Sequence, residues 1–178
     1  FRQYMASEQF QEDQAKRRER VTFFQEKLPR RLDDFSEADV DAIVSQLWAS
    51  RIWGNKDYLA HKIISDNGIE KLRQQLKELI ASDDPAAAYT RFLNAVKGLG
   101  PASTTEVLTY LHPQECGIWN RQARDALQAL GVTDYVNLNR YKISSREYRA
   151  FNRLLQAIAD ELRQAGIPDV DLLLVDFF

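Results

Sequence analysis

The sequence contains a single cysteine, Cys116, and only two histidines, His61 and His112. One cysteine cannot form an intrachain disulfide, and a lone thiol is typical of proteins kept in a reducing compartment. A four-ligand zinc site built from so few sulfur and imidazole groups would need several carboxylates, and neither histidine has a second ligand at metal-binding spacing. We therefore expect no metal site and no cofactor.

Long hydrophobic runs are also absent. No segment approaches the roughly 20 apolar residues that a membrane-spanning helix needs. The first residues carry neither an apolar signal core nor a small-residue cleavage site. We therefore expect a cytoplasmic protein without a membrane partner.

The chain has no excess of positive charge. Lys and Arg number 24, Asp and Glu number 26, and the formal net charge is -2. This balance argues against a generally basic polyanion binder, so any nucleic-acid contact must use local patches or backbone amides. The one basic run, KRRER over residues 16–20, is more typical of a solvated helix face than of a phosphate site.

Strand-like patterns are rare. Alternation of apolar and polar residues occurs only over residues 133–141, which are short and rich in Asn, so we interpret them as a loop. Elsewhere apolar residues recur at helical spacing between helix start and stop signals. Helices are predicted over residues 1–28, from about 38, over 55–65, 69–81, from 85, and over 101–111, 121–130 and 144–164. The expected fold class is all-α.

The length and the 44% hydrophobic content allow one core with or without a helical extension. We predict a charged N-terminal helical extension over residues 1–35 and a helical domain over residues 36–178. Residues 144–178 are expected to pack on that domain. The apolar end DVDLLLVDFF suggests either a helix on the core or a chain that continues into another domain.

The most informative stretch is Lys97-Gly98-Leu99-Gly100, which joins an apolar helix to a helix with Pro101 in its first turn. The two glycines permit a sharp turn, Leu99 anchors it, and the second helix presents free N–H groups outward. Such amides bind phosphate and give DNA affinity without base specificity. We therefore predict a helix-hairpin-helix element. Its candidate DNA-backbone contacts are Lys97, Gly98, Gly100, Ala102, Ser103 and Thr104.

The segment after this turn, CGIWNRQARDALQALG over residues 116–131, places Asn120 at a helix start 20 residues after Gly100. Together with the hairpin and with IVSQLWASRIWGNKDYLAHKII over residues 43–64, it resembles the helix-hairpin-helix superfamily of DNA glycosylases. The resemblance covers residues 38–132. It implies an all-α, glycosylase-like domain, duplex DNA as partner, and a pocket for a flipped base.

Two positions depart from the family pattern. Where the family has an apolar pair followed by a catalytic Asp, this chain has Ile118-Trp119 followed by Asn120, and an amide cannot supply a charged carboxylate. Where bifunctional members have a Lys, this chain has Ala102, so no amine is present for Schiff-base chemistry. We therefore predict no catalytic residue. Asn120 is either an ordinary helix cap or a hydrogen-bonding partner for a base edge.

Aromatic side chains are candidates for stacking on an extruded base. Trp53 is favoured because its neighbours are polar, whereas Trp48 follows the apolar face of Val44 and Leu47 and is expected in the core. Trp119 is also more typical of a core residue. The full set of base-pocket candidates is Arg51, Trp53, Asn55, Trp119 and Asn120.

Three functions remain open. The favoured one is a DNA-recognition module that grips one strand and inspects a modified base without excising it, in a DNA restriction, defence or repair protein with a separate nuclease or ATPase domain or subunit. The second is a divergent glycosylase whose carboxylate comes from Asp125, Glu115 or Asp57. The third is a helical protein-interaction domain that has lost DNA binding.

Overall fold

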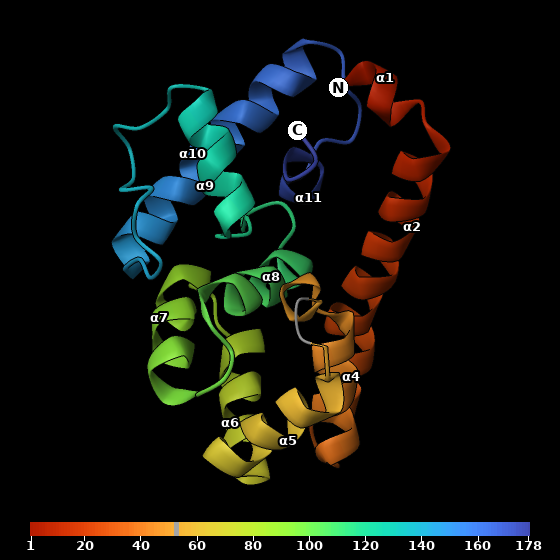
Figure 1. Cartoon of the computed structure of the whole chain (residues 1–178), viewed down its shortest axis with the longest axis vertical. Helices are drawn as coiled ribbons and strands as arrows, with labels where there is room; N and C mark the ends of the chain where they lie inside the picture. Colours follow the sequence, from red (N-terminus) through yellow and green to blue (C-terminus); the bar gives the residue numbers. More distant parts are fainter. Residues whose placement is uncertain (52–53) are drawn as a thin grey trace.

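The computed structural model describes residues 1–51 and 54–178, and these residues form helices and loops without a strand (Figure 1). The longer helices are α2 (Glu8–Thr22), α4 (Glu37–Gln46), α5 (Lys56–Asn67), α6 (Ile69–Ile80), α7 (Pro85–Ala95), α8 (Pro101–Leu111), α9 (Arg121–Ala129) and α10 (Ser145–Gln164). The shorter helical segments are α1 (Arg2–Met5), η1 (Phe23–Lys27), α3 (Leu28–Arg31), η2 (Trp48–Ser50) and α11 (Leu172–Val175). The predicted all-α fold class is confirmed.

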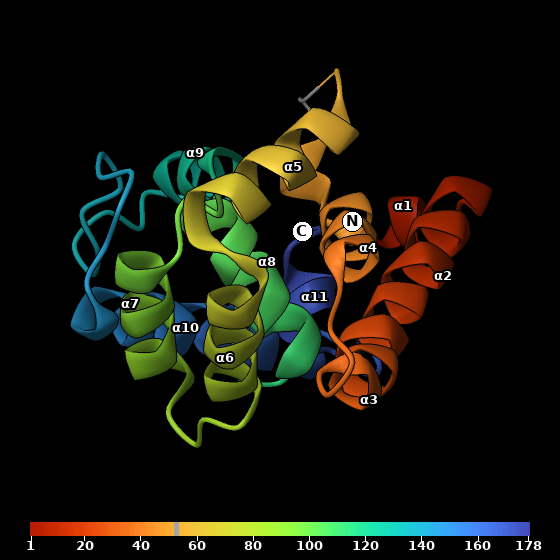
Figure 2. The same ribbon diagram turned by 90° about the horizontal axis from the view of Figure 1, so that it is seen from below.

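Helix α8 lies at the centre of the molecule. Helices α4 to α7 lie on one side of it, α9 to α11 lie on the other, and α2 runs alongside (Figure 1). A second view shows α5 and α9 at one edge of the molecule and α10 running behind α6 and α7 (Figure 2). The ends of the chain meet, because the Phe1 ring packs edge-on against Phe178 with 5.4 Å between centroids.

Side-chain caps explain where several helices begin. Ser144 and Glu147 form a reciprocal capping box at the start of α10, with 2.8 Å between the Ser144 nitrogen and a Glu147 oxygen. The Asp84 carboxylate accepts from the Ala87 N–H at the start of α7, where Pro85 occupies the first helical position. Such caps satisfy amides that have no partner inside the helix. The starts predicted near residues 85 and 144 are confirmed.

The N-terminal region is less regular than the single helix predicted over residues 1–28. The helix breaks before Ser7, whose hydroxyl caps α2 by accepting from the Phe10 N–H at 3.2 Å. At the other end, the π-helical turn η1 leads into α3, so the helical region continues beyond Pro29. Proline is tolerated there because it lies in the first turn of α3 and has no N–H to leave without a partner.

The N-terminal helices contribute to the core. The Phe24 ring stacks on the Tyr110 ring of α8, with centroids 5.4 Å apart and planes 12° from parallel. Phe10 and Leu28 are also buried. Residues 1–35 therefore pack directly on the central helix, and a separate boundary at residue 35 stays a prediction.

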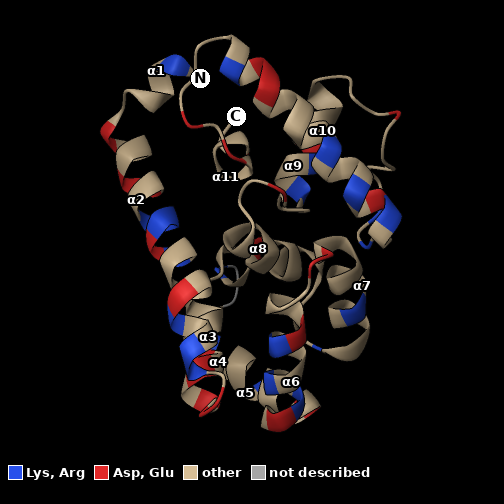
Figure 3. Cartoon of the chain, turned by 180° about the vertical axis from the view of Figure 1, so that it is seen from behind, with Lys and Arg blue, Asp and Glu red and all other residues tan. Residues whose placement is uncertain are grey.

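The C-terminal region follows two of the sequence expectations. Residues 133–141 form no helix or strand, as predicted. All four residues of α11 are buried, so the apolar segment near the end packs on the core. Helix α2 carries Asp and Glu mainly in its first half and Lys and Arg mainly in its second half, whereas α8 is almost uncharged (Figure 3).

Candidate nucleic-acid interface

The predicted turn between α7 and α8 is present. Gly98 has φ +88°, Leu99 is buried, and Gly100 is the N-cap of α8 with Pro101 as the first helical residue. By position, the Ala102 and Ser103 N–H groups have no acceptor inside the helix. The turn therefore presents backbone amides at one end of α8, which is the arrangement that captures anions.

Helix α5 supports this hairpin. The Asn67 side-chain amide accepts from the Lys97 N–H at 2.8 Å and donates to the Lys97 carbonyl at 2.9 Å. Gly98 fits closely against the same helix, because a Cβ there would lie 2.7 Å from Cγ1 of the buried Ile63. Nothing in the sequence singled out Asn67, because no local signal indicates a contact across 30 residues.

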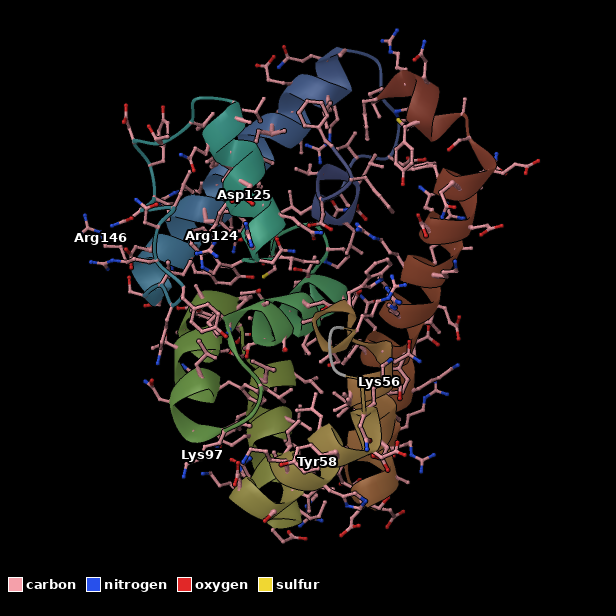
Figure 4. The ribbon with its side chains drawn as sticks, in the orientation of Figure 1. Lys56, Tyr58, Lys97, Arg124, Asp125 and Arg146 are labelled. Atoms are coloured by element: carbon pink, nitrogen blue, oxygen red, sulfur yellow. The ribbon has the colours of Figure 1, made fainter. Side chains whose placement is uncertain are left out.

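The predicted backbone-contact residues differ in exposure. Lys97 and Gly98 are exposed, and Lys97 extends away from the molecule (Figure 4). Gly100, Ala102 and Ser103 are partly buried. Thr104 is completely buried, and its hydroxyl lies 3.5 Å from the Leu99 carbonyl. Its side chain therefore belongs to the interior of the hairpin rather than to its exposed end.

Tyr141 lies beside the hairpin although nothing in the sequence singled it out. Its hydroxyl would be 2.5 Å from a Cβ at Gly100, and 68% of its surface is exposed. The surrounding loop is held in place because Trp119 Nε1 donates to the Tyr141 carbonyl at 3.1 Å and Arg124 donates to the Arg140 carbonyl at 2.8 Å. The exposed phenol is thus next to the free amides of α8.

Trp119 is not available for a base. It is 1% exposed, packs edge-on against Phe151, and donates its backbone N–H to the Thr105 hydroxyl at 2.9 Å. The prediction that Trp119 lines the base pocket is therefore wrong, and its interpretation as a core residue is confirmed. The physical reason is that the chain before α9 passes between α8 and α10, where a large ring fills the interior.

Asn120 is the N-cap of α9, as one of its two interpretations predicts. Its side-chain oxygen accepts from the Ala123 N–H at 2.8 Å. The neighbouring residues Ile118, Gln122 and Ala123 line an apolar cavity of about 350 Å³ against α10 and α11. The carboxylates considered as replacements, Asp57, Glu115 and Asp125, are all exposed.

Trp48 differs from the core position predicted for it. Helix α4 ends at Gln46, Leu47 has extended backbone angles, and the Trp48 side chain is 40% exposed. The end of α4 before Trp48 explains this difference, because the indole no longer follows the apolar face of that helix. The Arg51 guanidinium carbon lies 3.9 Å from its ring centroid and that of Arg20 lies 5.2 Å away.

A polar cavity of about 380 Å³ opens beside this ring, between α2 and the start of α5. We call it the Trp48 cavity. Its lining residues are Gln9, Asp13, Lys16, Arg20, Ser45, Leu47, Trp48, Arg51 and Lys56. Four cationic side chains face one carboxylate there, so the cavity favours anionic ligands, and the indole offers a stacking surface. Arg51 lines this cavity, and its role in a base pocket stays a prediction.

Other predicted pocket residues are placed differently. Asn55 is exposed and caps α5, accepting from the Tyr58 N–H at 2.9 Å, and the labelled Lys56 and Tyr58 follow it (Figure 4). Trp53 lies outside the described residues. A cavity shared by Trp53 and Asn120 therefore stays a prediction.

Glu106 connects the hairpin helix to the Trp48 turn. Its carboxylate is 1% exposed and accepts from the Trp48 N–H at 2.7 Å, the Ala49 N–H at 3.0 Å and the Tyr110 hydroxyl at 2.9 Å. Burial raises the pKa of this carboxyl group. Glu106 was not among the residues predicted for a site, although a lone acid in the apolar helix PASTTEVLTYL is a usable signal.

Within the described ranges, no three His, Cys, Asp or Glu side chains gather in a way that could hold a metal ion. The helices of those ranges are all too short or too polar to cross a membrane.

Comparison with known proteins shows a family for this chain. The family described as putative 8-oxoguanine DNA glycosylase OGG-like protein matches residues 7–174, which is nearly the whole chain and includes both the hairpin and the Trp48 cavity. No curated protein and no solved structure matches the chain.

Proposed function

The chain belongs to the family described as putative 8-oxoguanine DNA glycosylase OGG-like protein, and we propose that it binds duplex DNA and inspects a base without excising it. Family membership supports a DNA-related role. That the chain recognises a base without excising it is our own inference from the residues at the site.

The hairpin is the observation that carries the proposal. Gly98 and Gly100 shape a turn that directs free amides outward, and Lys97 and Tyr141 flank it on the exposed side. Amides at a helix N-terminus bind phosphate without reading sequence. In this proposal they grip one strand, which explains how a chain with a net charge of -2 holds a polyanion.

The absence of excision follows from two side chains. Ala102 supplies no amine in the first turn of α8, and Asn120 supplies an amide whose oxygen already caps α9. Neither group can stabilise a sugar cation as an ionised carboxylate does, and neither can form a Schiff base. At these two positions the chain therefore lacks the carboxylate and the amine on which excision in the family depends.

For the inspected base we propose the Trp48 cavity. A base extruded from the stack could lie against the indole, while Lys16, Arg20 and Lys56 neutralise the flanking phosphates. Oxidised guanine is the first modified base to test, since it is the one in the family description.

We predict that Lys97→Ala weakens binding to all duplexes alike, because it removes a phosphate contact and no base contact. The slope of log K against log salt should fall in magnitude by about 0.9, the value for one neutralised phosphate. Fluorescence anisotropy with guanine and 8-oxoguanine duplexes across a salt series measures both quantities. Lys27→Ala is the matched control, because Lys27 belongs to η1, which packs at the other end of α8.

A sequence-selective loss in Lys97→Ala would contradict the backbone role. If the wild-type protein does not retard any duplex, the interpretation as a protein-interaction domain replaces DNA recognition.

We also predict that the wild-type protein releases no base from duplexes containing uracil, 8-oxoguanine or an alkylated base. Asn120→Asp should fold normally, because Asp and Asn are equally good helix caps, and weak base release by this variant would support the alignment of Asn120 with the catalytic Asp of the family. The measurement is strand cleavage at abasic sites after alkaline treatment. Multiple turnover by the wild-type protein would show a working glycosylase instead.

Base excision is the second candidate function, and the family description favours it. It would require a carboxylate from elsewhere. Asp125 is exposed on α9 and lies 3.4 Å from Arg121, and Asp57 is exposed on α5. If the wild-type protein releases a base, the single carboxylate whose substitution abolishes that release would be the catalytic group. A nuclease or ATPase partner stays a prediction from the sequence.

A further inference from the structure

Glu106 is a buried acid whose partners all donate hydrogen bonds to it. One carboxylate oxygen accepts from the Trp48 N–H and from the Tyr110 hydroxyl, and the other accepts from the Ala49 N–H. The two backbone N–H groups cannot act as acceptors. This set of partners fits an ionised carboxylate and leaves no acceptor on the η2 side for a proton on Glu106.

The contact spans a long distance in sequence. Glu106 lies on the helix that begins at the hairpin, whereas Trp48 and Ala49 begin the turn that leads to Arg51. A charged acceptor makes stronger hydrogen bonds than a neutral one. The carboxylate thus joins the helix of the DNA-gripping turn to the backbone that carries the indole of the Trp48 cavity.

We propose that ionised Glu106 is a positioning residue that holds the η2 turn, and with it the Trp48 ring and Arg51, at the Trp48 cavity, and that protonation of Glu106 releases this turn. The inference rests on the proposed function for its consequence in DNA binding. The structural part, the position of Trp48, does not depend on DNA.

The surroundings of Glu106 raise the pH at which its carboxyl group takes up a proton above the usual range for a glutamate. Burial raises its pKa, and the hydrogen bonds from the turn and the Arg20 charge from α2 oppose that effect. Tyr110 on the same helix has a raised pKa and stays a donor. On the other sides, η2 presents backbone N–H groups and η1 presents the Phe24 ring, which stacks on Tyr110.

The release is expected without global unfolding. Because the pKa is raised in the folded protein, the folded state takes up a proton at higher pH than the unfolded chain does. The contribution of Glu106 to global stability is therefore present at low pH and lost as pH rises through the folded pKa. If the η2 turn leaves while the Glu106 carboxyl group stays buried, loss of the Trp48 and Ala49 N–H donors raises its pKa further. The released arrangement then binds the proton more tightly than the docked one, so acidification favours release without driving global unfolding.

The test uses the full chain labelled with 5-fluorotryptophan and observed by ¹⁹F NMR without DNA. Each tryptophan gives a resonance, and Trp48→Phe assigns the one from Trp48. In the wild-type protein we expect the Trp48 resonance to shift as the pH falls through the pKa of Glu106, while the resonance of the buried Trp119 stays in place. Glu106→Gln should give a Trp48 resonance in the acid position at every pH.

Tyr110→Phe is the matched control. It keeps the carboxylate and both backbone hydrogen bonds but removes one donor to the anion, so the shift should persist and move to higher pH. Duplex affinity at neutral pH should fall about tenfold in Glu106→Gln. A loss of this size lies near the lower end of the range for losing one base–aromatic stack.

A Trp48 resonance that does not titrate in the wild-type protein would overturn the inference, and so would Glu106→Gln with the neutral-pH resonance of the wild type. If Glu106→Gln does not fold, the wild-type and Tyr110→Phe titrations still decide. If the resonances behave as expected and the wild-type protein binds no duplex, the positioning role stands and the proposed function fails.

Discussion

Trp119→Ala is expected to lower the free energy of unfolding by about 3–5 kcal/mol, the range for removing a buried large aromatic side chain. Trp119 is 1% exposed, and its ring packs 5.1 Å from that of Phe151. Alanine would leave a cavity between α8 and α10 and would remove the hydrogen bond from Nε1 to the Tyr141 carbonyl. Urea unfolding followed by circular dichroism measures the loss.

Trp48→Ala is the matched control for this substitution. Trp48 is 40% exposed, and its main identified side-chain interaction is with arginines, worth about 0.5–1 kcal/mol at an exposed site. We therefore expect a small change in stability together with a loss of duplex affinity if the Trp48 cavity holds a base. Equal destabilisation by the two substitutions would contradict the assignment of one ring to the core and the other to the surface.

Gly98→Ala is expected to have the second large effect, on both folding and DNA binding. The left-handed conformation at φ +88° costs an alanine about 1–2 kcal/mol. The added Cβ would also lie 2.7 Å from Ile63 Cγ1, and overpacking of this kind costs about 1–3 kcal/mol. Because the hairpin must shift to relieve the contact, duplex affinity should fall at least tenfold. Unfolding and anisotropy measurements give the two values.

Gly131→Ala separates the two causes. Gly131 has φ +71° but nothing lies within 4 Å of a Cβ there, so only the conformational cost applies. Gly100→Ala provides a second comparison, since Gly100 has ordinary backbone angles and its Cβ would meet only the hydroxyl of the exposed Tyr141. If Gly98→Ala is no less stable than Gly131→Ala, the close packing of the hairpin on α5 is wrong.

The different behaviour of these glycines refines the sequence-based expectation. The pattern Gly98-Leu99-Gly100 predicts a turn in which both glycines are needed to a similar degree. Of these two glycines, only Gly98 has a conformation that disfavours side chains, and only Gly98 faces a buried side chain. Substitution of Gly100 is therefore the better probe of DNA binding in a stable protein.

The sequence by itself determined the features that depend on neighbouring residues. Helical periodicity, the glycine turn before Pro101, and the cap at Asn120 all involve groups within about one turn of chain, and the structure has each of them. Local hydrogen bonding and backbone sterics are encoded at short range, so they can be inferred without knowing what packs nearby. The absence of an ionisable group at positions 102 and 120 is likewise a property of the sequence alone.

Only the tertiary structure decided which side chains meet across the chain. Trp48 is exposed and Trp119 is buried because α4 ends before Trp48, whereas Trp119 lies between α8 and α10. Asn67 holds the hairpin from 30 residues away, and Glu106 holds the Trp48 turn from 58 residues away. A contact of this kind depends on the packing of whole helices, because the type of a residue does not indicate which distant residue it will contact.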